Sequence, residues 1–150
     1  AYLERLSHFL PTDNTLPLPG VLELIGTLRQ RQPAPVIGLL TGNHSKGAEL
    51  KLRHYNIWDE FEMGAFGDNT PERNAVAQEA LSWAKERWDD IKPEEILVIG
   101  DTQRDIECAR AIGAKVLAVA TGNSSVEELQ EFNPDWVSVD LLAKNLPQFV

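Results

Sequence analysis

The sequence predicts an α/β fold in which a parallel sheet is flanked by helices. Short, continuous apolar runs at residues 36–40, 96–99 and 116–119 are typical of strands that are buried on both faces. Amphipathic helical segments lie between these runs, and the alternation of strand and helix indicates a doubly wound α/β protein. In such folds ligands bind beyond the carboxyl ends of the strands, and this chain gathers its polar motifs there.

The remaining elements follow from periodicity and from punctuation by proline and glycine. Residues 1–10 have helical spacing, a helix at 104–112 ends before Gly113, and a Ser125-x-x-Glu128 capping box opens another helix. A shorter strand is expected at 136–139. The apolar faces of the other expected helices are formed by Val21, Leu24, Ile25 and Leu28, by Ala48, Leu52 and Tyr55, and by Ala77, Leu81, Ala84 and Trp88.

Composition restricts the class of partner. The chain has 150 residues, 43% of them hydrophobic, which is enough for one buried core. Its formal net charge of -9 argues against a broad nucleic-acid footprint or attraction to an anionic membrane. No apolar run reaches the length of a spanning helix and no leader pattern is present, so we expect a cytoplasmic protein.

The single cysteine, Cys108, is expected to fill space in the core.

The most informative motif is the segment Gly100 to Asp105, which directly follows the apolar run at 96–99. If a helix begins after Thr102, then Asp101 lies at the strand tip and Asp105 lies one turn further on, so both carboxylates can face one crevice. Carboxylate oxygens suit Mg²⁺, which takes one or two of them together with water and phosphate oxygens. The competing interpretation is that Asp101 caps a helix and Asp105 is solvated.

Two further groups of residues could bind an anion. The first strand runs into Thr41-Gly42-Asn43, where a hydroxyl, a glycine and the start of a helix favour phosphate binding, although a plain turn is an equal alternative. Arg73 is expected in the first turn of a helix, where a cation opposes the helix dipole and therefore invites a functional explanation. A surface ion pair would also explain Arg73. We interpret Thr121-Gly122 as a structural turn.

Taken in order, these motifs resemble the haloacid dehalogenase superfamily, particularly its phosphoglycolate-phosphatase-like hydrolases. The resemblance covers roughly residues 17 to 142 and implies a Rossmann-like core. It also implies that Thr41, Gly42, Asn43 and Arg73 bind the phosphoryl group, and that Asp101 and Asp105 hold Mg²⁺. Arg73 stands where the family usually has lysine, which keeps the charge but changes the reach. The implied catalytic residues are Thr41, Arg73 and Asp101.

The resemblance also implies an element that this sequence lacks. The family begins its core with a strand that ends in Asp-x-Asp-x-Thr, and the nearest string, residues 11–16, has proline in place of the first aspartate. We therefore interpret residues 1–16 as the end of a cap helix and a linker, and residues 17–150 as a core without its first strand. That strand would lie between those at 36–40 and 96–99, so we expect another segment or another chain to complete the sheet.

The function implied is a Mg²⁺-dependent phosphatase that acts on a small phosphate monoester through an aspartyl-phosphate, with the nucleophile outside this sequence. This chain by itself is expected to be inactive. One alternative is a catalytically inactive relative that binds a phosphorylated ligand or a protein partner. Others are a phosphonatase or a dehalogenase, of which the second would not need the paired aspartates. A nucleotide-binding domain would require a glycine-rich turn that Gly42 alone does not supply.

Overall fold

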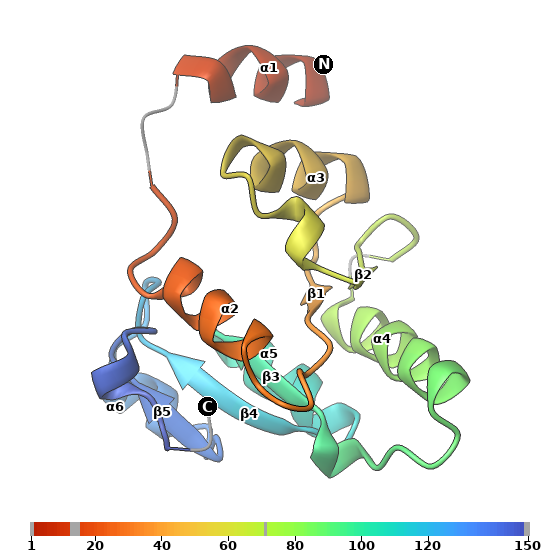
Figure 1. The fold of residues 1–150 in the computed structure, drawn as a ribbon, viewed down its shortest axis with the longest axis vertical. Helices are drawn as coiled ribbons and strands as arrows, with labels where there is room; N and C mark the ends of the chain where they lie inside the picture. The colour runs from red at the N-terminus through yellow and green to blue at the C-terminus, as the bar shows by residue number, and fades with distance from the viewer. Residues whose placement is uncertain (1, 13–15, 71, 149–150) are drawn as a thin grey trace.

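The computed structural model describes residues 2–12, 16–70 and 72–148, whose arrangement is shown in Figure 1. The helices are α1 (Tyr2–Phe9), α2 (Val21–Arg29), α3 (Ser45–His54), α4 (Arg73–Arg87), α5 (Gln103–Ala111) and α6 (Val126–Gln130). The strands are β1 (Gly38–Leu40), β2 (Met63–Ala65), β3 (Leu97–Gly100), β4 (Lys115–Val119) and β5 (Trp136–Ser138). Short 3-10 helices are η1 (Leu10–Thr12), η2 (Trp58–Glu60), η3 (Pro93–Glu95) and η4 (Ala143–Asn145). Every strand pairing is parallel and a helix separates each strand from the next, which confirms the predicted α/β class.

The strands form two sheets, and a further strand was expected between two of their members, β1 and β3. β1 pairs with β2, and β4 pairs with β3 on one side and with β5 on the other. β1 and β3 are not paired with each other, so each has one open edge among the residues that the structure describes. Strand β2 was not predicted, because Met63-Gly64-Ala65 is too short and too poor in large apolar side chains to resemble a buried strand.

The main core lies between helices α4 and α5 and one face of the β3–β4–β5 sheet. Its buried members are Ala77, Leu81, Val98, Ile106, Cys108, Ala109, Ile112, Ala114, Val116, Ala118 and Leu129. Val98 and Ile99 are neighbours on β3 and therefore point to opposite faces of the sheet. Val98 is 8% exposed, whereas Ile99 is 37% exposed, so the second face of β3 is only partly covered.

Local signals fixed several element boundaries. Gly113 has a φ of 73° and ends α5 with the paired bonds of a Schellman motif, from its own N–H to Arg110 and from Ala114 to Ala109. The predicted capping box is present, since Ser125 and Glu128 exchange backbone-to-side-chain hydrogen bonds of 2.8 and 3.2 Å. The predicted face of α4 was one residue too long, because the helix ends at Arg87 and Trp88 is its C-cap.

The amino-terminal segment forms the helix that its spacing predicted. α1 packs against α3 near Gly47, where a Cβ would lie 3.4 Å from the ring of Tyr2. The string at residues 11–16, which was compared with the nucleophile motif, lies partly outside the described residues, because 13–15 are not among them. Within the described part of the chain, no helix combines the length and the apolar character needed to span a bilayer.

Candidate functional site

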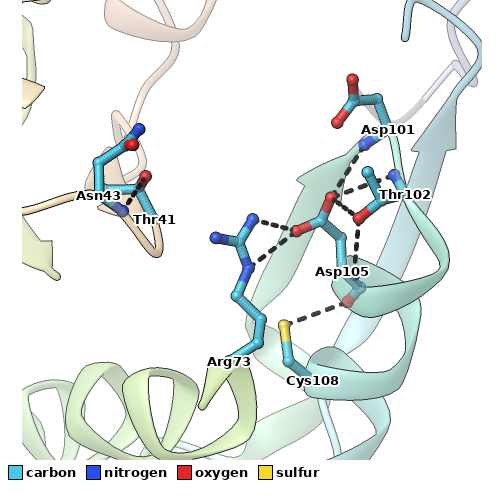
Figure 2. A network of polar contacts seen from close by, with 7 residues as sticks. All are labelled: Thr41, Asn43, Arg73, Asp101, Thr102, Asp105 and Cys108. Atoms are coloured by element: carbon cyan, nitrogen blue, oxygen red, sulfur yellow. Dashed lines mark hydrogen bonds and ion pairs between the residues drawn. The ribbon is translucent and has the colours of Figure 1, made fainter. Parts of the chain in front are cut away.

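Asp105 is the centre of the polar network shown in Figure 2. It lies in the first turn of α5 and is 4% exposed. Its Oδ2 accepts the backbone N–H of Asp101 and of Thr102, each at 3.1 Å, and the Thr102 hydroxyl at 2.8 Å. Its Oδ1 accepts hydrogen bonds from two nitrogens of the Arg73 guanidinium, of which Nε is at 3.1 Å. Both oxygens are therefore occupied by this chain's own donors.

Glycine is required beside this carboxylate. A Cβ added at Gly100 would lie 2.4 Å from Cγ of Asp105 and 2.6 Å from its Oδ2, which no side chain could tolerate. The close approach of the strand end to the first turn of α5 thus depends on the glycine that ends β3. The expectation that both carboxylates of the Gly100-to-Asp105 segment face one crevice stays a prediction.

The carboxylate of Asp101 behaves differently from that of Asp105. In Figure 2 it points away from Asp105, and only its backbone N–H takes part in the network. Within the described part of the chain, the one hydrogen bond drawn at Asp101 in Figure 2 comes from its backbone N–H, and none reaches its side-chain oxygens. Asp101 therefore presents a carboxylate that is still available to a ligand at the carboxyl end of β3.

Arg73 lies between the two groups of residues that the sequence singled out. Its guanidinium reaches Asp105 on one side, and on the other its Nη1 would be 3.4 Å from a Cβ at Gly42. In Figure 2 the guanidinium occupies the space between the loop of Thr41 and Asn43 and the start of α5. Its expected position in the first turn of α4 is confirmed. A planar cation at this place can bind an anion held against the Thr41 loop.

The Thr41 loop is held in a defined conformation. The Thr41 N–H donates to the carbonyl of Ala65 at 3.0 Å, and the Asn43 N–H donates to Thr41 Oγ1 at 3.1 Å. Because the Thr41 hydroxyl accepts this bond, its own proton can still be donated to an anionic oxygen. The backbone N–H of Asn43 is thus used within the loop, and the expected part of Asn43 in phosphate binding stays a prediction.

A second loop, which follows β2, braces the first. The Gly67 N–H donates to the carbonyl of Asn43 at 3.0 Å, and a Cβ at Gly67 would lie 2.2 Å from the carbonyl oxygen of Gly42. Asp68 accepts hydrogen bonds from the backbone N–H of Ser45 at 2.9 Å and from its hydroxyl at 3.0 Å. The backbone N–H of Ser45 thereby lowers the pKa of Asp68. The first amide of α3, which was expected to help bind an anion, already binds this carboxylate.

Sequence reasoning missed two of these supporting residues. Thr102 belongs to a Thr-x-x-Asp capping box, so the helix-start pattern itself could have identified it. Asp68 caps a helix from 23 residues away in the sequence, and no local pattern indicates that contact. Cys108 was correctly expected to be buried, and burial raises the pKa of its thiol.

The described residues supply only part of the ligand set that a divalent cation needs. No cluster of three or more potential metal-binding side chains of His, Cys, Asp or Glu occurs within residues 2–12, 16–70 and 72–148. Asp101 offers an available carboxylate, and Mg²⁺ needs only one or two such ligands when phosphate and water supply the rest. Asp105 could reach a metal directly only by giving up donors that it now binds, so its role as a metal ligand stays a prediction.

Comparison with known proteins places these residues in a family context. The hydrolase-like family model, described as HAD-hydrolase-like, matches residues 71–144. The phosphoglycolate phosphatase of Synechococcus elongatus is 31% identical over 122 residues, which are 79% of this chain and 53% of the relative. That of Vibrio vulnificus strain YJ016 is 31% identical over 144 residues, which are 95% of this chain and 57% of the relative. The chain thus spans little more than half the length of these relatives.

Solved structures share the fold. CbbY from Rhodobacter sphaeroides, in complex with phosphate, matches with a TM-score of 0.76 at 18% identity, over 94% of this chain and 61% of that chain. A predicted phosphoglycolate phosphatase from Haemophilus somnus 129pt matches with a TM-score of 0.68 at 23% identity, over 83% of this chain and 53% of that chain. At such identities the structural similarity establishes the fold alone.

Proposed function

Since this chain belongs to the haloacid dehalogenase superfamily of hydrolases, we propose that the protein is a phosphatase acting on a small phosphate monoester. The phosphoglycolate phosphatases among its relatives make a small phosphorylated acid the first substrate to examine. The observation that carries the proposal is the position of Arg73, whose guanidinium lies between the Thr41 loop and the buried carboxylate of Asp105.

Phosphate binding is assigned to the Thr41 loop and Arg73. The Thr41 hydroxyl donates to one phosphoryl oxygen, and the free edge of the Arg73 guanidinium binds another. Gly42 lets the phosphate approach the backbone closely, because it has no side chain to occupy that space. Asp105 orients Arg73 through its Oδ1, so the cation is already aimed before the substrate arrives.

A divalent cation, Mg²⁺ by the donor chemistry, is assigned to Asp101. Its carboxylate is the available hard-oxygen ligand at the carboxyl end of β3, and Asp105 supports it from behind by accepting the Asp101 N–H. When bound, the cation would offset negative charge on the phosphoryl oxygens. The formal charge of -9 makes such local compensation necessary for an anionic substrate.

The nucleophile is proposed to come from a strand that runs between β1 and β3. Support comes from the open edges of these two strands, because β1 ends directly before Thr41 and β3 ends directly before Asp101. An aspartate at the end of that strand would attack phosphorus, forming an aspartyl-phosphate as the ester P–O bond breaks and the alcohol leaves. Water would then hydrolyse the acyl phosphate and release inorganic phosphate. Thr41 and Arg73 hold the phosphoryl oxygens in both steps.

The test is the variant Asp101→Ala in the full-length protein. We expect its phosphate release from a panel of monoesters, with phosphoglycolate included, to fall by at least about 100-fold, because a group that stabilises transferring charge is lost. Asp90→Asn is the matched control, since Asp90 is an exposed carboxylate in the turn after α4. Near-normal turnover by the Asp101→Ala protein would refute the assignment. Binding of phosphate and Mg²⁺ by the unaltered protein without turnover would favour an inactive relative.

A further inference from the structure

Gly122, in the loop after β4, lies directly against the carboxylate of Asp101. A Cβ added at Gly122 would be 2.2 Å from Oδ2 of Asp101, 3.0 Å from its Cγ and 3.4 Å from its Cβ. The first distance is too short for real atoms, the second is unusually tight, and the last is an ordinary contact. The space that glycine leaves open at position 122 is therefore the space that the Asp101 carboxylate occupies.

Backbone conformation does not explain the glycine. The glycines with positive φ are Gly20 and Gly113, and Gly122 is not one of them. Alanine could adopt the same backbone at position 122, so the consequence of a side chain there is that the Asp101 carboxylate must move. This separates Gly122 from a glycine that is needed only to make a turn.

No hydrogen bond within the described residues fixes the direction of the Asp101 carboxylate. Its backbone is held by the bond from its N–H to Asp105, whereas Figure 2 draws no bond from any described residue to its side-chain oxygens. Its orientation therefore depends on the surfaces that it packs against, and the bare Cα of Gly122 is one of them. The backbone leading to Gly122 is held in place, because β4 is paired on both sides. The Ala120 N–H also donates to the carbonyl of Ser138 at 2.8 Å.

We propose that Gly122 is a positioning residue that sets the direction of the Asp101 carboxylate toward a divalent cation. This inference rests on the proposed function of Asp101. Any side chain at position 122 would turn the carboxylate away from its present direction while leaving Asp101 chemically intact. The Thr121-Gly122 loop, interpreted from the sequence as a plain turn, thus belongs to the site.

The first test needs no metal. In the full-length protein we compare the thermal midpoints of Gly122→Ala, Asp101→Ala and the double variant. We expect Gly122→Ala to lower the midpoint by about 2–4 °C when Asp101 is present and to leave it unchanged when residue 101 is alanine. Gly26→Ala is the matched control, because a Cβ at Gly26 meets no atom within 4 Å. An equal fall of the thermal midpoint in both backgrounds would show that the contact with Asp101 is not its cause, and would overturn the proposal.

The second test measures Mn²⁺ binding by electron paramagnetic resonance, with Mn²⁺ as the probe. We expect Gly122→Ala to weaken Mn²⁺ binding by about 10-fold or more, as the loss of an orienting contact does at other metal sites, and to add nothing in the Asp101→Ala background. Wild-type affinity in Gly122→Ala together with lost affinity in Asp101→Ala would overturn the role of Gly122 and leave the proposed function standing. Wild-type affinity and turnover in Asp101→Ala would instead overturn the proposed function.

Should Gly122→Ala fail to fold, the double variant decides. Its two Cβ atoms would be 3.4 Å apart, so removal of the carboxylate relieves the clash. Recovery of the fold in the double variant would support the proposal, and failure of both proteins to fold would overturn it.

Discussion

Asp105 shows how one buried side chain can organise a site without touching a ligand. Its Oδ2 fixes the backbone of Asp101 and Thr102, and its Oδ1 holds Arg73. The competing interpretation of Asp105 as a solvated carboxylate is wrong, because the residue is only 4% exposed. Its burial is tolerated because each oxygen accepts charged or well-aligned donors.

Removing Arg73 should therefore destabilise the protein. In Arg73→Ala the Asp105 carboxylate stays buried but loses its cation, and we expect the free energy of unfolding to fall by about 1–3 kcal/mol. Asp105→Asn should lessen this loss, since a neutral side chain needs no counter-charge. The measurement is urea unfolding of both single variants and the double variant. Strictly additive losses would show that the ion pair contributes nothing.

At this scale the sequence predicted which residues meet but not how they point. Spacing placed Asp101 and Asp105 at one strand end, and the helix-start position of Arg73 was expected. It could not foresee that Asp105 would face Arg73 while Asp101 faces Gly122. Those directions depend on contacts between loops that are far apart in the chain, and no local periodicity encodes them.

Among the elements, the start of α3 depends most on a distant residue. Its N-cap, His44, forms no side-chain capping bond, and the N–H of Ser45 is satisfied by Asp68 from the loop after β2. This contact fixes the Thr41 loop relative to β2, because the Thr41 loop leads directly into α3. The brace is electrostatic in part, since the pKa of Asp68 is lowered by the Ser45 N–H.

The contact between Asp68 and Ser45, which braces the Thr41 loop, should weaken in acid. A carboxyl whose folded pKa is lowered stabilises the fold above its unfolded pKa of about 4, and that contribution is lost as the pH falls through the folded pKa. We expect Asp68→Asn to have a lower thermal midpoint than the parent protein at pH 7. The difference should shrink below about pH 4. Asp90→Asn is the control, and a difference for Asp68→Asn that stays constant from pH 3 to 7 would contradict the electrostatic part of the brace.

Elements with a strong apolar pattern were predicted well. The runs at 96–99 and 116–119 became β3 and β4 within one residue, and the run at 36–40 contributed only Gly38–Leu40. β2 was missed because its pairing uses backbone groups opposite β1, and Gly64 and Ala65 carry no strand signal of their own. Backbone pairing across the chain is invisible to a local pattern of side chains.

On the scale of the whole molecule, the division into two sheets leaves β1 and β3 unpaired with each other, and these are the strands between which a further strand was expected. The family resemblance was confirmed by its relatives, and the missing strand between β1 and β3 stays a prediction. β3 and β4 offer an internal comparison, because β3 has one open edge and β4 is paired on both sides.

Hydrogen exchange tests this prediction. We expect amides of β1 and β3 to exchange much more slowly when the segment or chain that supplies the proposed strand is present than in the 150-residue chain alone. Amides of β4 should differ less between the two samples, because their pairing lies within this chain. Equal protection of β3 in both would argue that no further strand covers its edge.

Helix α4 packs on β1 and β2, which form one sheet, and also on α5, which packs on β3 and β4 of the other sheet. In Figure 1 it runs beside the two sheets, and Val76 and Ala77 on its inner side are fully buried. Because Arg73 is the first residue of α4, the packing of this helix sets where the Arg73 guanidinium lies relative to Asp105. A bulkier residue in place of the buried Ala77 would displace α4 and Arg73 with it, although no polar group of the network would be altered.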